Sequence, residues 1–100
     1  MAKILWSVFT SDMDHCFITG LPGVERHHII GKTKYNKMLC EEYGYIVPVI
    51  PRLHPNGAQA DAEGRALDIV FKQMAQRDFE AKHGTREEFI RLFGKSYLED

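Results

Sequence analysis

The sequence lacks long apolar runs and paired cysteines. No apolar stretch approaches the about 18–20 residues that a transmembrane helix needs, so we expect no membrane association. The stretch Met1–Trp6 carries one positive charge and no small-residue cleavage site, so we expect no signal peptide and a cytoplasmic protein. Cys16 and Cys40 form no Cys-x-x-Cys pair, which predicts two free, buried thiols in a reducing compartment.

The chain also has no surplus of basic residues. Thirteen lysines and arginines stand against fourteen aspartates and glutamates, a net charge of −1 with neutral histidines. Because counterion release drives nucleic-acid binding, this balance excludes a strong, nonspecific electrostatic DNA binder. A bound metal ion could still supply local positive charge at a phosphodiester.

The composition is that of a globular protein. Of the 100 residues, 44% are hydrophobic and 27% are charged, which excludes a disordered or fibrous chain. The length suits one domain over residues 1–100.

The first half of the chain is rich in short apolar runs. Residues 4–9 predict a strand, and the runs 16–18 and 24–30 flank a Gly/Pro turn that predicts a hairpin. A two-turn helix is expected over 36–43. The β-rich segment 45–51 contains two prolines, which restrict it to an edge or a short extended segment.

The second half is helical. A helix is expected from about residue 61 to residue 83, with apolar side chains spaced near a 3.6-residue period. Thr85–Glu88 reads as a capping box that opens another helix, which ends at Gly94. These helices should bury apolar stripes whose members are Leu67, Val70, Phe71, Met74, Phe79, Phe89, Ile90, Leu92 and Phe93. Strands first and helices last predict an α+β fold.

Three histidines are candidates for chemistry. Adjacent side chains of a strand point to opposite faces, so His27 and His28 cannot both be casual core residues. His54 follows in a loop just before the long helix. Strand histidines that converge with a histidine near a helix start are a reasonable metal-site geometry.

Several motifs resemble those of the HNH endonucleases, and in particular a small phage and prophage group of HNH proteins. The resemblance covers roughly residues 14–98, nearly the whole chain. It is carried by Cys16-Phe17-Ile18-Thr19-Gly20, Glu25-Arg26-His27-His28-Ile29-Ile30-Gly31, Asn36, Tyr43-Gly44, Val47-Pro48, His54, Gln76-Arg77-Asp78-Phe79-Glu80, Glu87-Glu88-Phe89-Ile90 and Phe93-Gly94-Lys95-Ser96-Tyr97-Leu98.

This resemblance implies a ββα-metal core, a hairpin plus a helix around one divalent cation, with additional C-terminal helices. It implies His27 and His54 as metal ligands, His28 as the general base and Asn36 as the residue that orients the base. Mg²⁺ or Mn²⁺ is the first expectation for the cation, with Zn²⁺ or Ni²⁺ as alternatives. The implied activity is hydrolysis of phosphodiester bonds in DNA, in a bacterial host cell.

One departure from the family concerns a second metal histidine. Related sequences carry it in a Gly-Val-His-x-Asn stretch, and the same spacing falls here on Ala62, which cannot bind a metal. Asp61 or Glu63 could replace it, because carboxylates are good ligands for Mg²⁺ and Mn²⁺. Alternatively, both acids complement the dipole at the start of the helix.

A local basic cluster stands beside the histidine pair. Its members are predicted to face the DNA backbone: Arg26, Lys32, Lys34 and Lys37. Besides DNA, a second copy of the chain or a phage protein is a partner class to expect. The alternative function is a degenerate HNH-fold module that binds DNA or protein without cleavage. A third hypothesis is a domain whose fold depends on a structural metal ion.

Overall fold

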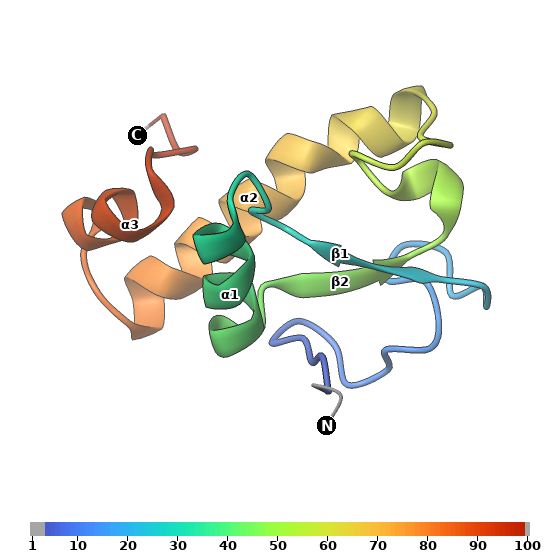
Figure 1. Cartoon of the computed structure of the whole chain (residues 1–100), viewed down its shortest axis with the longest axis horizontal. Helices are drawn as coiled ribbons and strands as arrows, with labels where there is room; N and C mark the ends of the chain where they lie inside the picture. The colour runs from blue at the N-terminus through green and yellow to red at the C-terminus, as the bar shows by residue number, and fades with distance from the viewer. Residues whose placement is uncertain (1–3, 100) are drawn as a thin grey trace.

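The two strands of the sheet are connected by a helix rather than by a tight turn. The structure is a computed structural model that describes residues 4–99. Strand β1 (Glu25–His28) is antiparallel to β2 (Ile46–Val49), and α1 (Lys34–Tyr43) lies between them in the chain (Figure 1). Glu25 is opposite Val49, and His28 is opposite Ile46.

A short 3₁₀ turn and two helices complete the chain. The turn η1 (Pro51–Leu53) follows β2, and α2 (Ala62–Lys82) and α3 (Arg86–Phe93) come last. Figure 1 shows α2 as the long helix that runs past the sheet, with α3 beyond its far end. This two-stranded sheet with three α-helices within residues 4–99 confirms the expected α+β class.

Two strand predictions are wrong. Residues 4–9 contain no strand, although the Val8 amide donates to the Gly44 carbonyl. Residues 16–18 do not pair with the following run, because backbone bonds between Cys16 and Leu21 and between Gly20 and Cys16 close a turn there. β1 therefore finds its partner in β2, whose Pro48 is tolerated because each strand of a two-stranded sheet is an edge.

The helix predictions are confirmed with small shifts in their ends. α1 begins two residues earlier than expected, because the Thr33 hydroxyl accepts from the Asn36 amide, and it ends at Gly44 with φ of 79°. The capping box of α3 is present at Thr85 and Glu88. Within residues 4–99, none of the helices has the length and apolar character needed to cross a membrane.

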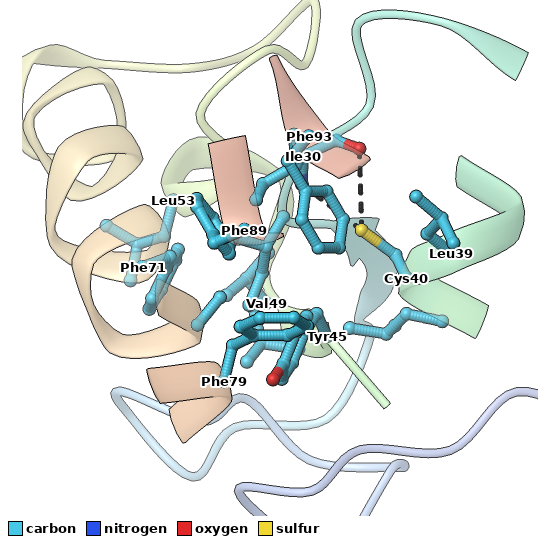
Figure 2. Packing of buried hydrophobic residues seen from close by; sticks show 14 of the residues in the cluster. Ile30, Leu39, Cys40, Tyr45, Val49, Leu53, Phe71, Phe79, Phe89 and Phe93 are labelled. Carbon is cyan, nitrogen blue, oxygen red and sulfur yellow. Dashed lines mark hydrogen bonds between the residues drawn. The ribbon is translucent and has the colours of Figure 1, made fainter. Parts of the chain in front are cut away.

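The core joins all three helices to the sheet (Figure 2). Both cysteines are free and buried, as predicted. The expected stripes are buried only in part, since Val70 and Ile90 are 45% and 38% exposed. The labelled core residues of Figure 2 come from α1 (Leu39, Cys40), from the strand region (Ile30, Tyr45, Val49), from η1 (Leu53), from α2 (Phe71, Phe79) and from α3 (Phe89, Phe93).

The start of α2 packs tightly against η1. A Cβ atom at Gly64 would collide with the Arg52 carbonyl oxygen and lie 3.0 Å from the Leu53 Cα, so only glycine fits there. The Asp61 amide also donates to the Arg52 carbonyl oxygen. These contacts fix the turn that leads into His54.

Candidate functional site

A basic cleft opens where β1, the start of α1 and the loop after η1 meet. Its volume is about 270 Å³. We call it the histidine cleft, and its lining includes Arg26, His27, His28, Lys37, His54 and Asn56. The three histidines of the sequence prediction are thus brought together, with two cations beside them.

His27 is the most deeply buried of the three histidines. Its side chain packs near Phe71 of α2, with ring centroids 6.1 Å apart, and the residue is 2% exposed. Burial, followed by the nearby His54, His28 and Lys72, lowers the pKa of His27 to about 3, so the ring is neutral at pH 7. Among the described side chains, Nε2 of His27 is one of two buried polar atoms without a hydrogen-bond partner. A buried ring nitrogen of this kind needs a hydrogen-bond partner, or a metal ion where it carries the lone pair.

His54 lies beside His27 and is oriented by a carboxylate. The two ring centroids are 4.9 Å apart, and Nδ1 of His54 is 2.7 Å from Oε1 of Glu25. Because an ionised carboxylate only accepts hydrogen bonds, this contact assigns the proton of neutral His54 to Nδ1. The lone pair then resides on Nε2. Metal-binding histidines are commonly oriented in this way, by a carboxylate that accepts from the ring nitrogen that does not bind the metal.

His28 is oriented in the same way by a residue of α1. Its Nε2 is 2.9 Å from Oε2 of Glu41, and both side chains are about one-fifth exposed. The carboxylate assigns the proton of neutral His28 to Nε2, which leaves Nδ1 with the basic lone pair. A neutral imidazole that is held in one tautomer is suited to accept a proton near pH 7.

The other predicted site residues have different surroundings. Asn36 is buried in the first turn of α1 and is not part of the cleft lining. Asp61 caps α2 by accepting from the Gly64 amide, and Arg52 is 3.2 Å from Asp61 and 3.5 Å from Glu63. Ala62 is the exposed first residue of α2. Across residues 4–99, three or more metal-ligating side chains do not come together in a group that could hold an ion.

The predicted basic cluster divides between two clefts. Arg26 and Lys37 line the histidine cleft, and Arg26 also contacts Asp14 at 3.2 Å. Lys32 lines a neighbouring cleft, whereas Lys34 is exposed and lines neither.

Sequence reasoning missed both carboxylates that orient the histidines. Glu25 could have been found, because side chains two apart in a strand share a face and Glu25 stands two positions before His27. Glu41 carries no such signal, since a glutamate on a short helix has the pattern of a solvated charge. Comparisons with protein-family models, with curated proteins and with solved structures found no match to this chain.

Proposed function

We propose that the protein is a metal-dependent nuclease of the HNH type that hydrolyses phosphodiester bonds in DNA. The observation that carries the proposal is the buried, unpartnered Nε2 of His27 beside the carboxylate-oriented His54, in a cleft lined by cations. In this proposal β1, β2 and α2 form the ββα core, with α1 inserted between the strands.

His28 is the proposed general base. Nδ1 takes a proton from a water molecule, the water oxygen bonds to phosphorus, and the bond from phosphorus to the leaving sugar oxygen breaks. Glu41 is a positioning residue, because its carboxylate fixes the tautomer of His28 and stabilises the imidazolium that forms. This role is the one that the resemblance gives to Asn36.

His27 and His54 fit the binding of one divalent cation. Both imidazoles are borderline ligands that suit Mn²⁺, Ni²⁺ and Zn²⁺, and water or phosphate oxygens would complete the shell. A cation bound there would supply Lewis-acid stabilisation of the phosphate. Asp61 and Glu63 stay the predicted further donors, and each would first have to leave Arg52.

Nicking of supercoiled plasmid tests this function. The purified protein is assayed with Mg²⁺, Mn²⁺, Ni²⁺ or Zn²⁺, and again with EDTA. Cleavage should be lost with EDTA and in His28→Ala, while calorimetric Mn²⁺ binding should be lost in His54→Leu. Folded protein that cleaves with none of the four metals would overturn the proposal.

The role of Glu41 in positioning His28 is tested by comparing Glu41→Gln with Glu42→Gln. Glu42 is the exposed neighbour of Glu41 on α1, so its substitution makes the same charge change. Glu41→Gln should lower kcat by about 10–100-fold with KM unchanged, and Glu42→Gln should change neither. Equal effects of the two substitutions would show that only net charge matters.

Two features of the sequence favour the alternative of a binding module without cleavage. Ala62 stands where related sequences carry the second metal histidine, and the net charge of the chain is −1. In that case the basic cleft would still bind DNA with EDTA present, and His27→Leu and His54→Leu would leave the affinity unchanged. Metal-dependent nicking in the plasmid assay would exclude this alternative.

A further inference from the structure

A second basic cleft adjoins the histidine cleft. Its volume is about 280 Å³, and the two clefts share Gly31 and Asn56. We call it the lysine cleft, since its polar lining is Asn56, Lys32, Lys72, Lys95 and Tyr97. Lys72 and Lys95 are far from the basic cluster of the sequence, so this cleft exists only in the folded chain.

The C-terminal segment completes the lysine cleft by folding back onto α2. The Tyr97 amide donates to Oε1 of Gln76 at 2.7 Å, and the Gln73 side chain donates to the Tyr97 carbonyl at 3.1 Å. The ammonium groups of Lys72 and Lys95 lie 5.3 and 5.5 Å from the centre of the Tyr97 ring, within cation–π range. Tyr97 therefore contacts both ammonium groups that α2 and the C-terminal segment contribute to the cleft.

The charge of the lysine cleft is only partly compensated. Lys72 is paired with Asp68 at 2.9 Å. Lys32 and Lys95 are exposed, and neither has a carboxylate at ion-pair distance among residues 4–99. No aspartate or glutamate of the described chain lines either cleft, but Asp14 and Asp68 contact the lining cations Arg26 and Lys72. The positive charge of the two clefts that is not paired within residues 4–99 is therefore that of Lys32, Lys37 and Lys95.

Resting on the proposed function, we infer that the lysine cleft binds a phosphate of the DNA strand next to the phosphate at the histidines. Two adjoining anion clefts suit a polyanion with closely spaced charges, whereas a small phosphate would occupy one cleft alone. Asn56 lies at the junction and can donate to either phosphate from its amide group. The lysines supply position and affinity without reading sequence.

Salt dependence of DNA binding tests this inference without cleavage. Fluorescence anisotropy with a labelled DNA duplex is measured in EDTA over a range of salt concentrations, for the wild type and for Lys32→Gln/Lys95→Gln. Each neutralised phosphate contributes about 0.9 to the magnitude of the slope of log K against log salt, so the double variant, which loses the one phosphate of this cleft, should show a slope smaller by about 0.9. Arg77→Gln/Lys82→Gln removes two charges from α2 outside both clefts and should keep the wild-type slope.

The outcomes separate this inference from the proposed function. A wild-type slope in Lys32→Gln/Lys95→Gln, or no DNA binding by the wild type at low salt, overturns the lysine cleft whatever the plasmid assay shows. If Lys32→Gln/Lys95→Gln lowers the slope but the wild type cleaves plasmid with none of the four metals, the result supports the lysine cleft and overturns the nuclease. Displacement of DNA by an equal phosphate concentration of inorganic phosphate would identify a free-phosphate site and overturn the inference.

Discussion

Two buried polar side chains, His27 and Gln76, have opposite surroundings. Gln76 is fully buried and donates to Glu80 and Ser96 at 2.8 and 2.9 Å while it accepts from the Tyr97 amide. His27 is almost as buried, but its Nε2 has no partner within the described chain. Gln76 thus ties the C-terminal segment to α2, whereas Nε2 of His27 is a buried polar atom without a hydrogen bond in a residue that lines a cleft. Such an atom costs stability unless a partner is supplied, and the proposed cation would supply one.

The strongest test of this contrast is the same substitution at both positions. Gln76→Leu leaves the Tyr97 amide and the Ser96 hydroxyl without their buried partner, and it should lower the free energy of unfolding by about 3 kcal/mol. Urea denaturation at pH 7 measures the change. Gln73→Leu, which removes one half-buried bond to the Tyr97 carbonyl, is the control and should cost about 1 kcal/mol. Equal losses would show that the buried network has no special weight.

Cys40, like Gln76, is a buried group with hydrogen-bond partners, and its effect on stability should be seen at alkaline pH. Its thiol donates to the Ile30 carbonyl and accepts from the Ile30 amide, both at 3.4 Å, and burial raises the pKa of Cys40 to about 11. The unfolded thiol loses its proton near pH 9, so the unfolded state is favoured as the pH rises from 9 to 11. The part of this loss that comes from Cys40 should be about 2 kcal/mol over this window.

Cys40→Ala should remove that part of the pH dependence. Unfolding is followed in denaturant with a reducing agent at pH 8 and pH 11, for the wild type, Cys40→Ala and Cys16→Ala. Burial raises the pKa of Cys16, but hydrogen bonds with Thr19 and the Ile50 backbone outweigh it and lower the pKa overall. Cys16→Ala should therefore keep the alkaline loss, and the same slope in all three proteins would contradict the assignment to Cys40.

The acids at the start of α2 should behave as structural groups. Asp61→Ala removes the bond to the Gly64 amide and should destabilise the protein by about 1 kcal/mol. Glu63→Ala loses only an exposed contact with Arg52 and should change stability by less than about 0.5 kcal/mol. Thermal unfolding ranks the two, and equal effects would mean that the capping bond contributes nothing.

His27→Leu should have only a small effect on stability, although the residue is buried. Leucine has a similar size and replaces an unpartnered polar atom in an apolar position near Phe71, so the free energy of unfolding should stay within about 1 kcal/mol of the wild type. The same variant should lose calorimetric Mn²⁺ binding. A loss of stability as large as that of Gln76→Leu would remove the contrast and assign His27 to the core.

Local signals in the sequence predicted the helices well and the strand pairing badly. Thr85, Gly44 and Gly94 act within one turn of chain, so their effects can be read without the fold. The choice of β2 as partner for β1 depends on where α1 packs, which no local pattern records. The three histidines were found because they are chemically distinctive. Glu41 meets His28, and Lys95 meets the lysine cleft, only through the folded arrangement, and both residue types are common on any surface.

The close packing at Gly64 has a consequence for recognising relatives of this chain. Position 62 is exposed on the first turn of α2, so it can change from one sequence to another without disturbing the fold. Gly64 cannot change, since any side chain would collide with the backbone of η1. Any relative that keeps the packing of α2 against η1 should therefore keep a glycine at this position, whatever residue stands at position 62.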